Sequence, residues 1–161
     1  MIFVTVGTQL GFERLARAVD AWAAEHPDSE VFVQLGEATY QPQHCKFAAF
    51  TDHDEWEQLF QRAERVVSHA GMGTILKSLD YGKPLIIMPR LASLGEHRND
   101  HQVATAKRFV GFSTITTVND ADELEAALNT PVTQGGPNTG NRSDNLNALI
   151  AEIQRFINAR A

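Results

Sequence analysis

The sequence predicts an α/β protein built on a Rossmann-like parallel sheet with helices on both of its faces. Short runs of β-branched and aliphatic residues alternate along the chain with longer stretches whose apolar residues recur at helical spacing. Glycine-rich turns directly follow two of these runs, at residues 7–11 and 69–73. Such alternation favours a parallel sheet, because each crossover between parallel strands supplies a helix that covers the sheet. The 161 residues are predicted to form one domain over residues 1–161.

The first part of the chain predicts three strands and two helices. In order, these are strand 2–6, helix 12–23, strand 31–33, strand 46–50 and a helix that follows Asp54. The strands are runs of β-branched, aromatic and small apolar residues, and the helices carry an apolar residue every three or four positions. Pro27 ends the first helix, since proline cannot continue the backbone hydrogen bonds of a helix.

The middle of the chain repeats this alternation. The expected elements are strand 65–68, helix 73–81, strand 85–88, a helix over roughly 99–109 and a β-branched run at 113–118. Gly82 and Pro84 interrupt the chain after the first of these helices, and Pro89 closes the strand that follows it.

The last part predicts two further helices and one loop. Asp120 and Glu123 resemble a capping box, which marks the start of a helix. Residues 130–142 are rich in Gly, Pro, Asn and Thr and predict a loop. An apolar stripe from Leu146 to Ile157 predicts a final helix, which covers either the domain's own sheet or a partner.

Composition limits the possible partners. The net charge of −6, without a cluster of Lys or Arg, disfavours binding to a nucleic-acid backbone. Cys45 is the only cysteine, so the sequence offers no internal disulfide and no cysteine-based metal site, and it fits a reducing cytoplasm. The start of the chain has no basic region of the signal-peptide kind, and no apolar run approaches the roughly 20 residues that span a bilayer. Contact with a membrane is therefore expected only through a partner.

Two strand ends offer candidate ligand contacts that also have plain structural explanations. Gly7 can adopt a positive φ, and Thr8 can offer a hydroxyl and an N–H group to a phosphate. A simple turn with a threonine cap explains the same residues. Phe50, at the end of a strand, could pack against a nucleobase, or it could be a core residue that precedes an aspartate cap.

Residues 68–74 form the most specific segment. Gly71 and Gly73 allow close backbone approach to a ligand, and Thr74 lies in the first turn of the predicted helix. A helix N-terminus presents N–H groups to an anion such as a diphosphate. His69 either binds that ligand or has a structural role. The segment matches neither the P-loop nor the dinucleotide fingerprint, which argues against an ATPase and a nicotinamide enzyme.

Residues 96–102 are seven consecutive polar side chains that follow a strand and open a helix. Ligands rich in hydroxyl groups need many oriented donors and acceptors, so this segment is a candidate sugar site, although a solvated loop is the alternative. His97 and His101 have a spacing that also occurs among metal ligands, but no further metal-binding pattern accompanies them, and no metal or other cofactor is expected.

Together, in order, these segments resemble the glycosyltransferase family 28 C-terminal domain. The residues that carry the resemblance are residues 4–8, Phe50 with Asp52, residues 68–74, residues 82–86 and His101 with Gln102. Within the family, the chain looks like the small subunit of split transferases, which include a eukaryotic UDP-GlcNAc transferase subunit and bacterial exopolysaccharide subunits. Residues 89–102 are most similar to the bacterial β-1,4-glucuronosyltransferase subunits.

The resemblance implies the C-terminal, donor-binding half of an inverting GT-B enzyme that needs no metal. The enzyme would be a UDP-dependent hexosyltransferase that moves glucuronic acid, galactose or GlcNAc to a lipid-linked glycan in exopolysaccharide biosynthesis. A membrane-anchored partner subunit would bind the acceptor and supply the general base, so no catalytic residue is assigned to this chain. The chain would then be cytoplasmic and peripheral to the inner face of the membrane.

By position, the resemblance also implies roles for individual residues. Gly7 and Thr8 would lie near the diphosphate and Phe50 beside the uracil. His69, Gly71, Gly73 and Thr74 would form the phosphate and ribose loop, while His101 and Gln102 would bind sugar hydroxyls. Many relatives have a glutamate at the position of Lys77, where it holds the ribose hydroxyls, and lysine cannot accept those hydrogen bonds. Glu96 is the candidate substitute.

Three other functions compete with this one. A nucleotide-sugar-binding regulatory subunit would keep the ligand without the chemistry. A UDP-sugar 2-epimerase relative would carry both halves of the GT-B plan in one chain, and a length of 161 residues argues against it. A flavodoxin-like module would need a loop rich in Ser and Thr after the first strand, and residues 7–11 contain a single Thr and no Ser.

Overall fold

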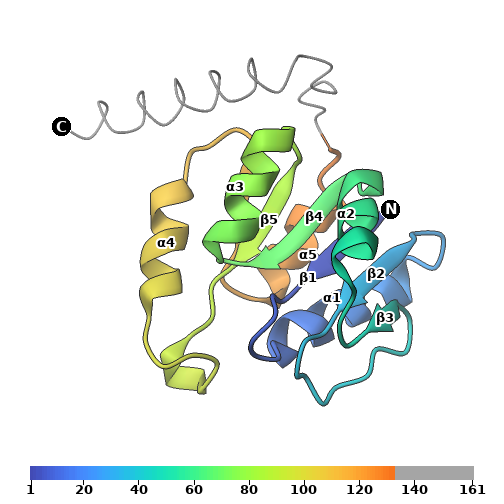
Figure 1. Ribbon diagram of the computed structural model, residues 1–161, viewed down its shortest axis with the longest axis horizontal. Helices are drawn as coiled ribbons and strands as arrows, with labels where there is room; N and C mark the ends of the chain where they lie inside the picture. Colours follow the sequence, from blue (N-terminus) through green and yellow to red (C-terminus); the bar gives the residue numbers. More distant parts are fainter. Residues whose placement is uncertain (133–161) are drawn as a thin grey trace.

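The computed structural model describes residues 1–132, whose six strands form one parallel sheet in the order β3-β2-β1-β4-β5-β6 (Figure 1). The strands are β1 (Ile2–Thr5), β2 (Val31–Gln34), β3 (Lys46–Ala48), β4 (Arg65–His69), β5 (Leu85–Met88) and β6 (Ile115–Thr117). Ile2 of β1 is in register with Val31 on one side and with Arg65 on the other. The strand order reverses between β1 and β4, and the carboxyl end of this pair is where ligands bind in open parallel sheets. The predicted Rossmann-like fold is confirmed.

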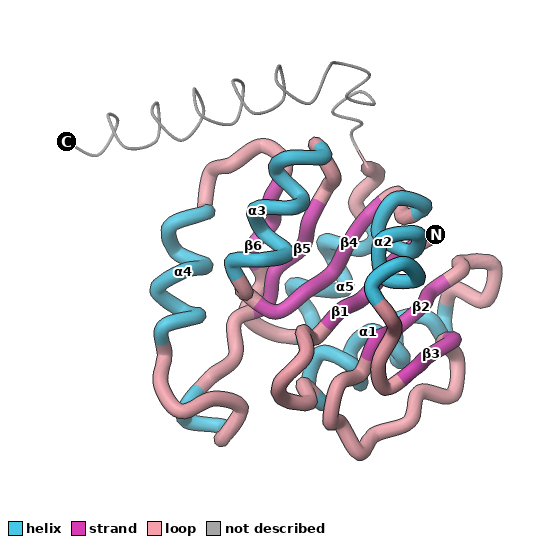
Figure 2. The backbone as a smooth tube through the Cα atoms, in the orientation of Figure 1, coloured by secondary structure: helices cyan, strands magenta, loops and turns pink. Residues whose placement is uncertain are grey.

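Helices cover both faces of this sheet (Figure 2). They are α1 (Glu13–Glu25), α2 (His53–Arg62), α3 (Met72–Tyr81), α4 (His101–Phe109) and α5 (Ala121–Asn129). One core joins the inner sides of α1 and α5 to one face of the sheet. A second core joins α2, α3 and α4 to the opposite face.

Successive apolar residues of the inner strands alternate between these two cores. In β5, Ile86 and Met88 pack in the α1 and α5 core, whereas Leu85 and Ile87 pack in the other. All four side chains are buried. Burial on both faces explains why the strands are continuous apolar runs in the sequence.

Helix ends follow the predicted capping chemistry more closely than the predicted boundaries. The Asp120 side chain accepts a hydrogen bond from the Glu123 N–H group at 2.9 Å, as expected at the start of α5. Asp52 caps α2 by accepting from the Glu55 N–H group at 2.8 Å, so this helix starts before Asp54. The helix expected from residue 99 begins at His101.

One described segment lies outside the simple alternation. The loop between β5 and α4 contains a short 3-10 helix, η1 (Ala92–Leu94), that the sequence analysis treats as plain loop. The helix expected over 146–157 lies outside the described residues, as does most of the loop expected over 130–142. Among the helices of residues 1–132, none has both the length and the apolar character needed to cross a membrane.

Candidate functional site

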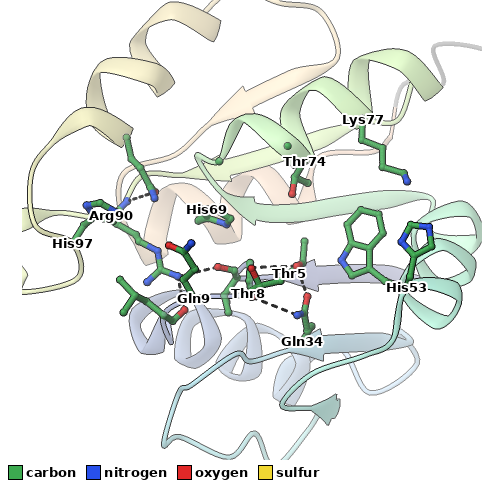
Figure 3. Close-up of a pocket in the computed structure, with 17 residues that line it drawn as sticks. Thr5, Thr8, Gln9, Gln34, His53, His69, Thr74, Lys77, Arg90 and His97 are labelled. Carbon is green, nitrogen blue, oxygen red and sulfur yellow. Dashed lines mark hydrogen bonds between the residues drawn. The ribbon is translucent and has the colours of Figure 1, made fainter.

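A cavity of about 440 Å³ opens at the carboxyl ends of β1 and β4, where the strand order reverses (Figure 3). The ends of β1, β2 and β4, the helices α2 and α3, and the loop after β5 all contribute to it. Its lining residues are Thr5, Val6, Gly7, Thr8, Gln9, Leu10, Gln34, His53, Trp56, His69, Gly71, Gly73, Thr74, Lys77, Arg90, His97 and Gln102. Sequence positions that are far apart therefore meet at one edge of the sheet.

Buried polar side chains form the floor of the cavity. Thr5 and Gln34 are 1% and 2% exposed, and the Thr5 hydroxyl donates to Gln34 Oε1 at 2.6 Å. The Gln34 amide donates in turn to the Gly7 carbonyl oxygen at 3.4 Å. Gly7 has φ of +86°, a conformation that favours glycine. The network holds the turn after β1 in a fixed position above the sheet.

His69 occupies the centre of the cavity, between two glycines. A Cβ atom on Gly7 would lie 2.8 Å from His69 Cε1, and one on Gly71 would overlap the ring at Nε2. Burial lowers the pKa of His69 to about 4, and the positive charge of Arg90 adds to this effect. The imidazole is therefore neutral at pH 7, and a hydrogen bond to the Thr5 backbone helps to orient it.

The N-terminus of α3 borders the cavity. Gly71 is its N-cap and provides no side-chain cap, while Gly73 and Thr74 of the first turn line the cavity. Apart from its two chain neighbours and the nearby backbone of its own helix, no described atom lies within 4 Å of the position that a Cβ on Gly73 would occupy. The open space beside Gly73 thus lies where a helix end favours an anion.

Arg90 fixes the loop that follows β1. Its guanidinium is almost fully buried and donates to the carbonyl oxygens of Val6 at 2.9 Å, Leu10 at 2.7 Å and Gly11. Burial lowers the pKa of Arg90, partly offset by Glu96, but an arginine remains protonated at neutral pH. A positive charge is thus held at the wall of the cavity.

The other end of the cavity is aromatic. Trp56 and His53 reach it from α2, and Lys77 from α3. The Lys77 ammonium pairs with Glu57 and lies 4.9 Å from the centroid of the Trp56 ring. The hydrogen bond from Lys77 is the main reason that the pKa of Glu57 lies below its ordinary value. Lys77 therefore presents a donor and not the acceptor that a glutamate would offer.

The lining excludes negative charge. None of the described residues that line the cavity is an aspartate or glutamate. Arg90 is a cation at its wall, whereas the charge of Lys77 is balanced by Glu57. The whole chain has a net charge of −6, so this edge of the sheet differs from the molecule as a whole. Residues 1–132 also contain no group of three or more His, Cys, Asp or Glu that could hold a metal ion. The arrangement suits an anionic ligand bound through amides and cations.

Seven of the ten predicted site residues line this cavity, and three lie elsewhere. The seven are Gly7, Thr8, His69, Gly71, Gly73, Thr74 and Gln102. Phe50 is 53% exposed and is not among the lining residues. The Glu96 carboxylate is bound by Arg14 Nε at 2.7 Å and by the Leu91 N–H group at 2.8 Å. His101 is exposed, and its ring contacts Asn99.

Sequence reasoning did not single out several lining residues. Thr5 and Gln34 are polar residues at the ends of otherwise apolar strands, and this pattern could have indicated them. Arg90, a charge directly after a buried strand and Pro89, gave a similar signal. Trp56 lies in the helix predicted after Asp54, and nothing in the sequence shows that such a residue also borders a cavity.

Comparison with known proteins gives a family match and similar sequences. The model of the glycosyltransferase family 28 C-terminal domain matches residues 1–154. The UDP-N-acetylglucosamine transferase subunit ALG13 of Mus musculus is 33% identical over 115 residues, which cover 66% of this chain and 10% of the relative. The ALG13 subunit of Eremothecium gossypii is 34% identical over 119 residues, which cover 73% of this chain and 56% of the relative. The chain thus spans little more than half of the Eremothecium gossypii relative and a tenth of the Mus musculus one.

Solved structures share the fold. A solution structure of ALG13 has a TM-score of 0.61 at 20% identity, covering 92% of this chain and 94% of that one. The crystal structure of the glycotransferase of kitacinnamycin has a TM-score of 0.64 at 20% identity, covering 96% of this chain and 39% of that one. The predicted likeness to the C-terminal half of a GT-B glycosyltransferase is confirmed at the level of the fold.

Proposed function

The chain belongs to the glycosyltransferase family 28 C-terminal domain family, and on this premise we propose that it is the donor-binding subunit of a two-component glycosyltransferase. The enzyme moves a sugar from a UDP-sugar to a lipid-linked glycan. One observation supports this most strongly: the cavity at the switch point combines the open N-terminus of α3 with a lining that contains no carboxylate. A diphosphate is the part of a UDP-sugar that such a lining fits.

The two ends of the cavity suggest how the donor lies in it. The diphosphate is placed at Gly73 and Thr74, in the open space at the start of α3. The aromatic end, with Trp56 and His53, is the natural place for a planar base. The sugar then extends to the end formed by Arg90, His97 and Gln102.

The chemistry that this chain can supply is stabilisation of the leaving group. Negative charge develops on UDP as the bond to the sugar breaks, and amides at a helix end together with a fixed cation stabilise it without a metal. A general base for the acceptor hydroxyl is still required. Among the described lining residues there is no carboxylate, and His69 is enclosed by Gly7 and Gly71. His53 and His97 also line the cavity, but the resemblance to the family implies a base on the acceptor-binding half, so we assign the base to the partner, in an inverting reaction.

A separate acceptor-binding subunit is the second part of the proposal. Exposed apolar side chains occur in the segments that follow three of the strands: Leu10 after β1, Met72 in the first turn of α3 and Leu94 in η1. The similar ALG13 proteins are named as subunits, and the chain covers 94% of one ALG13 structure but only 39% of the larger glycotransferase. We propose that a membrane-anchored partner covers this edge and brings the chain to the cytoplasmic face of the membrane.

The sugar and the pathway are finer parts of the same proposal. The ALG13 relatives are named for UDP-N-acetylglucosamine, whereas residues 89–102 resemble glucuronosyltransferase subunits of exopolysaccharide synthesis. We propose exopolysaccharide assembly as the setting, with GlcNAc, glucuronic acid and galactose as the sugars to compare.

Reconstitution tests the proposed function. The purified full chain is added to membranes from cells of the source organism in which its gene has been deleted. Transfer of radiolabelled sugar from each UDP-sugar to the lipids of these membranes is then measured. Transfer is expected only when chain and membranes are combined, and a Gly73→Ala chain is expected not to restore it. If membranes from the deletion strain transfer as much sugar without the chain as with it, the catalytic role is contradicted. If the chain binds UDP but no sugar is transferred, it is a regulatory subunit instead.

A further inference from the structure

His97 lies at the wall of the cavity without a complete set of hydrogen bonds. Its Nδ1 atom is buried and has no hydrogen-bond partner among the described residues. A neutral imidazole offers one donor and one acceptor, and buried polar atoms are paired in nearly all proteins. Because Nδ1 is shielded from solvent, a ligand can contact the ring only through those of its atoms that line the cavity.

The position of His97 indicates which group this is. Figure 3 shows His97 beside Arg90 on one side of His69, with Lys77 and His53 on the other side. Trp56 marks the latter end as the aromatic one, and the start of α3 lies between the two ends. With the diphosphate at α3, a ligand part that reaches His97 lies beyond the phosphates, on the side away from the base.

The loop that carries His97 is held in place. The neighbouring Glu96 accepts from Arg14 Nε at 2.7 Å and Nη2 at 2.9 Å, and also from the Leu91 N–H group. The His101 ring lies edge-on to His97 with centroids 4.5 Å apart. The side chain is therefore positioned before any ligand binds, which lowers the entropic cost of a contact.

We propose, building on the proposed function, that His97 forms a hydrogen bond with a hydroxyl group of the transferred sugar. Burial, followed by the nearby His101, Arg90 and Arg98, lowers the pKa of His97, although the Asn99 backbone acts in the opposite direction. A histidine with an ordinary pKa near 6.5 is already mostly uncharged at pH 7, and this shift favours the neutral form further, which suits a neutral hydroxyl group better than a phosphate. His97 is a specificity residue in this scheme, since its contact is made only by the sugar.

Comparison of UDP with UDP-sugars separates this role from a structural one. The full chain and its His97→Ala and His97→Gln variants are titrated calorimetrically with UDP, UDP-GlcNAc, UDP-glucuronate and UDP-galactose. His97→Ala is expected to weaken binding of at least one UDP-sugar by about five- to tenfold and to leave UDP affinity unchanged. His97→Gln, which keeps a donor and an acceptor, is expected to recover part of that loss. His44→Ala, at an exposed histidine outside the lining, is the matched control.

The outcomes are distinct. If His97→Ala leaves the ratio of UDP-sugar to UDP affinity unchanged for all three sugars, the inference is overturned while the proposed function stands. A parallel loss of UDP and UDP-sugar binding also overturns it, because the residue then supports the loop or the phosphates. If the unmodified chain binds no UDP, the proposed function itself fails.

Discussion

At the scale of single residues, the site depends on where side chains are missing as much as on where they are present. Gly7 and Gly71 have no Cβ atom that would collide with the His69 ring, whereas Gly73 borders open space. The three glycines look alike in the sequence, yet the first two serve the protein's own packing. Only Gly73 leaves room for a ligand.

A pair of glycine variants tests this difference. Gly73→Ala is expected to keep the fold, with a gain of up to about 1 kcal/mol because alanine favours the helix, and to weaken UDP binding at least about tenfold. Gly71→Ala is expected to destabilise the chain by about 1–3 kcal/mol, because its Cβ would overlap the His69 ring. Thermal unfolding and calorimetry measure both effects. Unchanged UDP affinity in a folded Gly73→Ala chain contradicts the assignment of the diphosphate.

The lowered pKa of His69 predicts a pH dependence of stability. Below pH 6.5 the unfolded chain takes up a proton at this residue, but the folded chain does so only near pH 4. The stabilisation is therefore complete above pH 6.5 and is lost as the pH falls toward 4, by about 3 kcal/mol in all. Urea unfolding at pH 7 and pH 4.5 measures this loss. His69→Gln is expected to reduce the difference in the free energy of unfolding between pH 7 and pH 4.5. If that difference is unchanged, another group is responsible for it.

At the scale of elements, the sequence predicted types and order well, because period and capping are local properties. The alternation of strands and helices, the capping aspartate of α5 and the glycine-rich turn before α3 all appear in the structure. Local pattern does not determine which way a loop side chain points. Phe50 and Glu96 are at the expected edge of the sheet, but one is exposed and the other pairs with Arg14.

The ion pair of Arg14 and Glu96 joins α1 to the loop after β5, and its contribution can be measured. Glu96→Gln is expected to destabilise the chain by about 1–3 kcal/mol, since the carboxylate side chain is only 12% exposed and accepts several hydrogen bonds. It is also expected to weaken UDP-sugar binding more than UDP binding, because the loop carries His97.

Glu30→Gln is the matched control for that variant. Glu30 pairs with Lys46 and Arg62 at the surface, where its side chain is 46% exposed. Glu30→Gln is expected to change the free energy of unfolding, measured with urea, by less than about 0.5 kcal/mol. Equal effects of the two substitutions are inconsistent with a structural role for the buried pair.

At the scale of the whole molecule, the strand order brings together residues from along the chain. The reversal between β1 and β4 places Thr5, His69 and Arg90 around one cavity, although these residues are far apart in sequence. The fold class followed from the alternation of elements, but the lining depends on this order and on side-chain directions. Thr5, Gln34 and Trp56 therefore emerged only from the structure.

Calorimetric titration of the full chain with UDP tests the central claim most directly. The account predicts saturable binding at a single site, a rise in the melting temperature with UDP, and loss of both in a folded Gly73→Ala chain. No heat at millimolar UDP from a folded chain, with and without the partner membranes, contradicts the account.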